Sequence, residues 1–247
     1  ILDSIPSRGL GDVYKRQFQN SAPIANDIYL VEKFFNEGLR FMQLTYNNQT
    51  ALAGGCFEPI DSGLSRFGYA VIEEMNRLGM IVDLSHAGKK TCLDAIKFSK
   101  KPVAISHANP TFFHKSIRNI ESDVLKKLVN KNGFIGLSLY PYHLKNLGKC
   151  KEEDFAQMIK DLIQLIGEDN IGIGSDLCLN WPNEVVMWMR NGKWTKKIDY
   201  GESKEKNPEW PELPSWYNKP GDLKNLFYIL TKNNICLLYT SDAADDL

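Results

Sequence analysis

Two short apolar runs, each followed by Ser-His, constrain the fold of this chain more than any other feature. The runs MIVDL and PVAI, within residues 79–119, have the length of a strand and are rich in β-branched residues, and the segment between them has the apolar spacing of one helix. The stretch therefore predicts a strand, a helix and a second strand. Such strands run parallel and are buried on both faces, so we expect His86 and His107 just beyond the carboxyl ends of neighbouring strands.

Two imidazoles side by side at that edge would form half of a metal site, because neutral histidine is a common zinc ligand. The carboxyl edge is also where α/β folds carry their chemistry. A single histidine after a strand is more often structural, but here the same element occurs in two consecutive units. From the residues alone, a shared metal site and two separate structural histidines both stay open.

The rest of the chain continues this alternation of strands and helices. Further strands are expected at 40–46, 133–140 and 170–176, and further helices after Asp27, at 66–79, at 122–131, before Gly167 and at 222–234. Ser65 and Ser122 are the expected helix N-caps, and Gly38 and Gly167 the expected helix ends. The glycine-rich segment between the strand at 40–46 and Ser65 is long enough to line a pocket. One α/β barrel is a standard use of 247 residues with this pattern.

Composition excludes several other classes. Lys plus Arg and Asp plus Glu are 30 each, so the net charge of zero gives no attraction to nucleic acid or anionic membrane. The five cysteines are widely spaced without a Cys-x-x-Cys pair, which argues against a disulfide framework and a cysteine zinc site. No apolar run approaches 18 residues, so no transmembrane segment is expected.

Both ends look foreign to the domain. Residues 1–17 and 236–247 resemble translated adapter sequence, which leaves 18–235 as one partial barrel domain. All five tryptophans fall in an aromatic-rich insertion at about 177–221, which we expect to pack over the barrel mouth. A disordered linker is the alternative for this insertion.

Several segments resemble the membrane dipeptidase (renal dipeptidase-like) family of zinc peptidases, within the amidohydrolase-type barrels. They are GLRFMQLTYNN (38–48), GLSRFGYAVIEEMNRLGMIVDLSH (63–86), PVAISHANP (102–110), IRN (117–119) and IGIGSD (171–176). The resemblance implies a TIM-type (β/α)8 barrel, incomplete in this chain because the first strands and the last unit are missing. It also implies hydrolysis of dipeptides or similar small amides by a metal-activated water.

The resemblance assigns roles to individual residues. His86 and His107 match two zinc ligands, and Asp176 matches the catalytic aspartate that moves the proton between the attacking water and the leaving amine. Arg118 matches the arginine that holds the substrate carboxylate. By residue type alone, Asp176 would be a turn or cap residue and Arg118 a solvated one. Asp83, on the same strand face as His86, could orient an imidazole or cap a neighbouring helix.

The chain departs from the family pattern at three places. The family's His-x-Asp pair is absent, Gln19 stands at the position of the bridging glutamate, and Tyr46 stands where the family has a substrate-binding histidine. An amide bridges two cations more weakly than a carboxylate, whereas a tyrosine hydroxyl can still donate to an oxyanion. These departures indicate a divergent, bacterial-type member with one or two zinc ions or another divalent metal.

Other readings stay open at this level. A one-metal hydrolase or lyase of the same barrel class, acting on another small carboxylate, and a non-catalytic barrel binding protein are the alternatives. We expect the chain as written to be poorly stable, to bind fewer than two zinc ions and to be inactive, because the strand carrying His-x-Asp is missing. His114 and His143 are expected to be surface or loop residues. A homodimer and a bacterial cytoplasmic or periplasmic location are left open.

Overall fold

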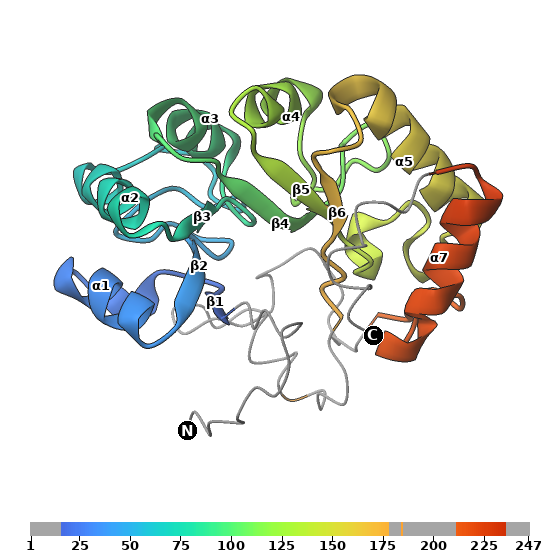
Figure 1. Cartoon of the computed structure of the whole chain (residues 1–247), viewed down its shortest axis with the longest axis horizontal. Helices are drawn as coiled ribbons and strands as arrows, with labels where there is room; N and C mark the ends of the chain where they lie inside the picture. The colour runs from blue at the N-terminus through green and yellow to red at the C-terminus, as the bar shows by residue number, and fades with distance from the viewer. Residues whose placement is uncertain (1–15, 178–183, 185–210, 236–247) are drawn as a thin grey trace.

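The computed structural model describes residues 16–177, 184 and 211–235. Within them one parallel sheet follows the order of the chain, β1-β2-β3-β4-β5-β6 (Figure 1). The strands are β1 (Arg16–Phe18), β2 (Leu39–Gln43), β3 (Ile81–Asp83), β4 (Ala104–Ala108), β5 (Phe134–Leu137) and β6 (Ile171–Ile173). Because β1 and β6 are the two edges of this sheet, the described part is an open arc of six strands.

The helices cover the convex side of the arc, and the strands lie inside them (Figure 1). They are α1 (Tyr29–Asn36), α2 (Arg66–Leu78), α3 (Lys89–Phe98), α4 (Ser122–Val129), α5 (Glu152–Ile166) and α7 (Leu223–Lys232), with short 3-10 helices η1 (Ala22–Ile24), η2 (Pro141–His143), η3 (Leu147–Lys149) and η4 (Pro220–Asp222). This is the predicted α/β architecture of a TIM-type barrel, here unclosed. None of the described helices is long and apolar enough to span a membrane.

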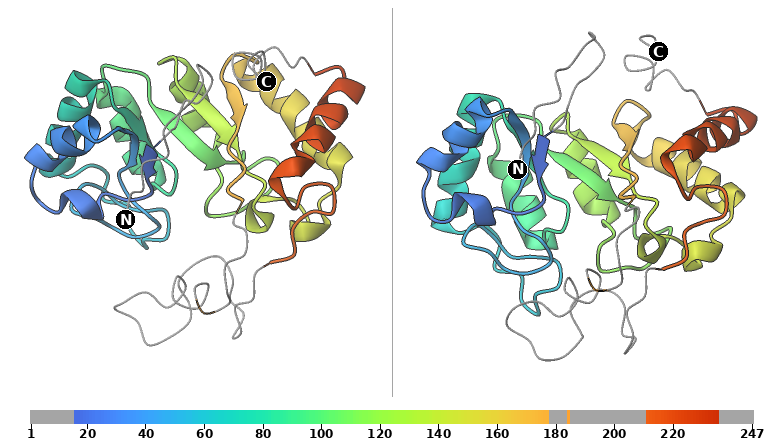
Figure 2. Two further views of the ribbon diagram at one scale, coloured as in Figure 1. Left: turned by 60° about the horizontal axis from the view of Figure 1, so that its bottom comes forward. Right: turned by 90° about the horizontal axis from the view of Figure 1, so that it is seen from below.

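The core lies between the sheet and the helices. Met42, Val82, Ile105 and Ile135 of the strands are buried, as are the inward faces of α2, α4 and α5. Burial on both faces explains why the strands read as continuous apolar runs. It also leaves only the strand ends and their loops for polar side chains, and the loops after β2 and β5 lie toward the same side of the sheet (Figure 2).

Local signals in the sequence account for most element boundaries. Ser65 Oγ accepts a hydrogen bond from the Gly68 backbone N–H at 3.0 Å, so this predicted cap is confirmed. Gly38 and Gly167 follow α1 and α5 with φ values of 102° and 82°. Ser122 is not a cap but the first residue of α4. The Ile120 N–H donates to the Asn109 carbonyl, and the Ile120 carbonyl accepts from the Thr111 N–H. These two hydrogen bonds hold the chain extended before the helix, which starts directly after Glu121.

The segment boundaries expected from the sequence are only partly covered by the structure. Arg16 and Gln17, which the sequence analysis assigned to the foreign segment, form β1 together with Phe18 and pair with β2. Residues 1–15, residues 236–247 and most of the tryptophan-rich insertion lie outside the described residues, so their origin and packing stay predictions. Where the insertion is described again, Trp216 is buried and its Nε1 donates to the Cys150 backbone oxygen at 2.9 Å.

Candidate metal centre

His86 and His107 lie together, as the two Ser-His elements predicted. Their Nε2 atoms are 3.0 Å apart, their rings are 65° to each other, and only 6% and 5% of the two residues is exposed. His86 follows β3 by three residues, whereas His107 lies inside β4 rather than beyond it, so that part of the expectation is wrong. The reason is that β4 continues past a register shift after Ile105 and pairs Ala108 with Leu137 of β5.

His86 is held by residues from the end of β2. Its Nδ1 lies 2.6 Å from Asn47 Oδ1, and the ring of Tyr46 stacks on the imidazole at 4.1 Å between centroids. The backbone carbonyl of His86 accepts from Thr45 Oγ1 at 3.2 Å and from the Cys56 N–H at 2.8 Å. These contacts matter because His86 has a φ of 66°, a left-handed conformation that an L-residue keeps only when its surroundings hold it.

The His107 ring is held by side chains of β3 and β4. Its Nδ1 lies 2.9 Å from Ser106 Oγ, and that hydroxyl donates to Asp83 Oδ2 at 2.5 Å. Asp83 is fully buried on β3. The carboxylate therefore contacts the imidazole through one serine and can orient it, as the sequence suggested, and its hydrogen bonds go to Ser85, Ser106, Gln17 and Gln43 and not to a helix N-terminus.

The surroundings keep both imidazoles neutral. Burial lowers the pKa of His86 well below its usual value, and the nearby Arg118 guanidinium lowers it further. Burial also lowers the pKa of His107, although Asp176 and Asp83 act in the opposite direction. A neutral imidazole is the form that binds a metal ion, so the site is electrostatically prepared for one.

The donor set fits a metal ion in part. Both Nδ1 atoms already have an oxygen partner, so the two Nε2 atoms facing each other are the ring positions left for a cation. Two nitrogens on one tetrahedral zinc ion, with bonds of about 2.0–2.1 Å, lie about 3.3 Å apart, close to the spacing found here. Within residues 16–177, 184 and 211–235, no group of three or more His, Cys, Asp or Glu side chains could hold a metal ion. His86 and His107 are thus the candidate ligands that the described residues bring together.

Arg118 lies beside the histidine pair and is buried, although its residue type alone suggested a solvated side chain. Only 3% of the residue is exposed, and its Nη2 donates to the His107 backbone oxygen at 3.1 Å. Its Nε is buried and has no hydrogen-bond partner within the described part of the chain. A buried guanidinium with an unmatched donor is suited to an anionic ligand.

Asp176 and Gln19 are placed less closely. Asp176 follows β6 by three residues with a φ of 53°, is half-buried, and is near enough to raise the pKa of His107. Gln19 is exposed one residue after β1, whereas Gln17 points inward and its Nε2 reaches Asp83 and Ser106 at 2.5 and 3.1 Å. The bridging role of Gln19 stays a prediction.

Sequence reasoning missed four side chains around the pair: Gln17, Asn47, Ser106 and His143. Asn47 could have been found, because it is a polar residue at the carboxyl end of a strand, as the histidines are. Gln17 lies within residues 1–17, which were expected to be foreign to the domain, so no site role was predicted for it. Ser106 precedes His107 directly, so strand alternation suggested that it points to the opposite face.

His143 is the fourth missed residue, and its assignment to the surface is wrong. The side chain is 2% exposed, and its Nδ1 lies 2.7 Å from Ser138 Oγ. The amides of Asn109 and Asn119 donate to its backbone oxygen at 3.1 and 3.0 Å, which draws η2 onto the loop after β4. His114 is a half-buried loop residue.

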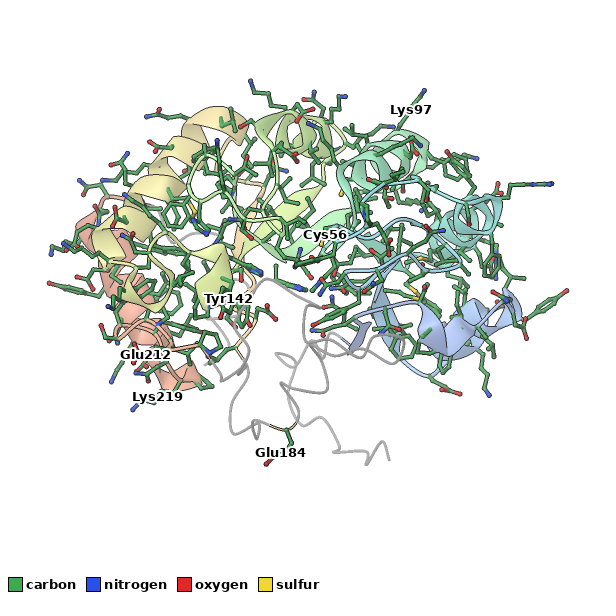
Figure 3. All side chains as sticks on the ribbon, turned by 180° about the vertical axis from the view of Figure 1, so that it is seen from behind. Cys56, Lys97, Tyr142, Glu184, Glu212 and Lys219 are labelled. Carbon is green, nitrogen blue, oxygen red and sulfur yellow. The ribbon has the colours of Figure 1, made fainter. Side chains whose placement is uncertain are left out.

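A cavity of about 220 Å³ is lined by Ala87 and Gly88, which directly follow His86, and by residues of neighbouring loops and helices. The glycine-rich loop after β2 lines it with Gly55, Cys56, Glu58 and Asp61, as the sequence predicted, opposite the segment 116–121. In Figure 3, Cys56 of this loop and Tyr142 of η2 lie on the inner side of the arc, whereas Lys97 of α3 points outward. Loops of the carboxyl edge and the first turns of α3 and α4, with Lys89, Cys92 and Val124, thus line this cavity together.

Comparison with known proteins agrees with this geometry. The family model of the membrane dipeptidases, peptidase family M19, matches residues 17–182. Dipeptidase aclJ from Aspergillus oryzae is 31% identical over 192 residues, which are 70% of this chain and 44% of that protein. An amidohydrolase from Pseudomonas aeruginosa has a TM-score of 0.81 at 30% identity, covering 92% of this chain and 67% of that chain.

A second solved structure, of dipeptidase AC, a metallopeptidase of family M19, has a TM-score of 0.62 at 26% identity and covers 66% of this chain and 49% of that chain. The chain spans 38–45% of the length of the curated relatives that it matches. Both structures share the α/β arrangement of the described residues. The family match includes the segments that carry His86, His107 and Asp176.

Proposed function

The chain belongs to the membrane dipeptidase family, and from this premise we propose that its site serves metal-dependent hydrolysis of a dipeptide or a similar small amide. The observation that carries the proposal is the pair of buried, neutral imidazoles with Nε2 atoms 3.0 Å apart. Structural histidines usually direct their ring nitrogens to oxygen partners, and here the two Nε2 atoms face each other.

His86 and His107 would hold the metal ion, with zinc as the ion typical of the family. Bound there, zinc would lower the pKa of a coordinated water and polarise the scissile carbonyl. The chain's own contribution is to keep both ligands neutral by burial and to fix both rings through Asn47 and Ser106. Gln19 stays a candidate ligand from the family match.

Asp176 would move the proton. Its carboxylate accepts a proton from the attacking water as the new C–O bond forms, and returns it to the amide nitrogen as the C–N bond breaks. Support comes from its place after β6 and from its electrostatic effect on His107, which put the carboxylate near the pair.

Arg118 and Tyr46 would bind the substrate. The buried Nε of Arg118 supplies a donor for the substrate's terminal carboxylate, which favours dipeptides over uncharged amides. The Tyr46 ring stacks on His86 at 4.1 Å between centroids, and its hydroxyl would donate to the developing oxyanion.

A one-metal hydrolase or lyase acting on another small carboxylate is the second candidate. The observation that favours it is the donor set, because the described residues supply two imidazoles and no cluster of three ligating side chains. Two imidazoles suit one ion better than two.

Zinc stoichiometry, measured together with hydrolysis of a dipeptide panel, tests the proposal. In a full-length form of the protein, which restores the strand carrying His-x-Asp, we expect His86→Ala and His107→Ala each to lose zinc and activity, whereas His114→Ala, the matched change in a half-buried loop histidine, keeps both. Retention of zinc and activity in both His86→Ala and His107→Ala would overturn the proposal. The panel should include N-acylated amino acids and small lactones, because cleavage of these alone would favour the second candidate. Joining the family's His-x-Asp strand ahead of Arg16, so that β1 is kept, tests whether a second ion requires it.

A further inference from the structure

Asp83 is a fully buried carboxylate that only accepts hydrogen bonds. Its Oδ1 accepts from the Ser85 N–H at 3.0 Å, the Ser85 hydroxyl at 2.9 Å and the Ser106 N–H at 3.0 Å. Its Oδ2 accepts from Gln17, Gln43 and the Ser106 hydroxyl at 2.5, 3.2 and 2.5 Å. Six donors from three strands (β1, β2 and β4) and the loop after β3 therefore fix this carboxylate in place.

Ser106 has one hydroxyl proton and three neighbours that could accept it. The most distant is Ser85 Oγ at 3.2 Å, whose lone pairs are also weaker acceptors than a carboxylate. Asp83 Oδ2 lies 2.5 Å from Ser106 Oγ, and His107 Nδ1 lies 2.9 Å from it. If the proton pointed to the imidazole, two oxygen lone pairs would face each other at the shorter distance with no proton between them. A hydrogen bond to a carboxylate is also stronger than one to a neutral acceptor. The Ser106 proton therefore lies toward Asp83.

With its proton directed to Asp83, Ser106 Oγ can only accept from His107. The hydrogen of His107 must then be on Nδ1, and Nε2 carries a lone pair that faces His86. We propose that Ser106, itself fixed by Asp83, is a positioning residue that selects the Nδ1–H tautomer of His107 and so makes Nε2 a metal ligand. The inference depends on the proposed function only for the identity of the ligand.

His143 provides an internal contrast. Its Nδ1 also contacts a serine hydroxyl, that of Ser138 at 2.7 Å, and Ser138 Oγ accepts from the Tyr140 N–H at 3.2 Å. The Ser138 proton can point to His143 Nδ1, so this serine does not impose the Nδ1–H form. The same serine-histidine contact thus has a different effect depending on whether a carboxylate takes the serine proton.

Ring ¹⁵N chemical shifts of histidine-labelled, metal-free protein at neutral pH test the proposal. In the wild type we expect the hydrogen of His107 on Nδ1. In Asp83→Asn the side-chain amide can donate to Ser106, whose proton is released toward His107, and we expect the hydrogen to shift to Nε2. Ser106→Ala should lose the preference, and Ser106→Thr, which keeps the hydroxyl, should retain it. Ser138→Ala is the matched control and should change the signals of His143 alone.

Zinc affinity is the second readout, with circular dichroism to confirm folding. Ser106→Ala should weaken zinc binding by about 10–100-fold, the usual effect of removing an outer partner of a ligating histidine, and Ser106→Thr should stay near the wild type. A wild-type His107 with its hydrogen on Nε2, or an Nδ1–H form that persists in Ser106→Ala, would overturn the proposal. Should Asp83→Asn not fold, the Ser106 pair decides alone. The expected tautomers in a protein without zinc binding would instead reject the proposed function.

Discussion

His86 and His107 bring their Nε2 atoms to the same point from two different kinds of backbone. His107 lies in β4, where hydrogen bonds to β5 fix the chain and the pleat fixes the direction of the side chain. His86 lies on a turn after β3 with a φ of 66°. A strand therefore places its histidine by sheet pairing, and the turn has to place its histidine by side-chain contacts.

The supports around the two rings differ accordingly. His107 needs only its tautomer set, which one hydroxyl and a buried carboxylate can do. His86 needs its position held as well, and this comes from Asn47, from the stacked ring of Tyr46 and from two hydrogen bonds to its carbonyl oxygen. The comparison predicts that the His86 side of the site depends on the loop after β2 and the His107 side on the sheet.

The largest expected effect is on kcat, and it distinguishes proton transfer by Asp176 from metal binding by the two histidines. In the full-length enzyme, Asp176→Asn should lower kcat by about 10²–10⁴-fold, because a proton-transfer group acts on the transition state, and should leave the zinc content nearly unchanged. Steady-state kinetics with metal analysis on the same preparation provide the measurement. Loss of zinc with an unaltered kcat per bound ion would make Asp176 a third ligand, and the two-histidine comparison would then be incomplete.

A matched pair at Asn47 tests the His86 side directly. Asn47 has a φ of 60°, which glycine and aspartate also tolerate, so both substitutions keep the backbone. Asn47→Gly removes the oxygen that lies 2.6 Å from His86 Nδ1 and should weaken zinc binding by about 10–100-fold, whereas Asn47→Asp keeps an acceptor and should bind at least as tightly. Chelator competition measures both constants. Unchanged affinity in Asn47→Gly would mean that the turn and Tyr46 suffice.

The smallest expected effect is a pH dependence of stability. Burial lowers the pKa of His86, His107 and His143 in the folded protein, so between the folded and unfolded pKa values the unfolded chain binds more protons. The free energy of unfolding of metal-free protein should therefore fall as the pH is lowered through about 6.5, by up to about 1.4 kcal/mol per pH unit for each histidine. Urea unfolding between about pH 7.5 and 5.5 measures the slope.

His143→Asn should reduce this slope by up to one proton. Burial and Arg118 lower the pKa of both site histidines. At His107, Asp176 and Asp83 partly offset this lowering, whereas at His86 the neighbouring histidines add to it, so the two histidines should differ. On acidification His107 should therefore titrate before His86 in an NMR titration. The reverse order would contradict the placement of Asp176 on the His107 side.

Particular residues show how far the sequence could predict this site. The repeated strand-Ser-His pattern predicted that His86 and His107 share an edge, because parallel neighbouring strands end at the same side of a sheet. Ser65 predicted the start of α2 because its hydroxyl satisfies a backbone donor close by in the chain. Signals of this kind act within one element or between adjacent ones, so they can be recognised along the chain.

The partners of the two rings could not be predicted in the same way. Asn47 is 39 residues from His86 in the sequence, Gln17 is 66 from Asp83, and Asn109 is 34 from His143. These contacts depend on how strands far apart in the chain lie next to each other and on which way a loop turns. The same holds for Arg118. Its residue type suggested a solvent-exposed side chain, but the side chain is buried and donates to the His107 backbone oxygen.

The sequence by itself determined the alternation of strands and helices, the edge that carries the polar residues and the two histidines that meet there. These features follow from apolar periodicity and from the direction of parallel strands, both of which are local properties of the chain. Only the tertiary structure decided which nitrogen of each imidazole faces the partner ring. That orientation depends on the contacts of the two Nδ1 atoms with Ser106 Oγ and Asn47 Oδ1, and contacts of this kind form only after separate strands and loops have packed together.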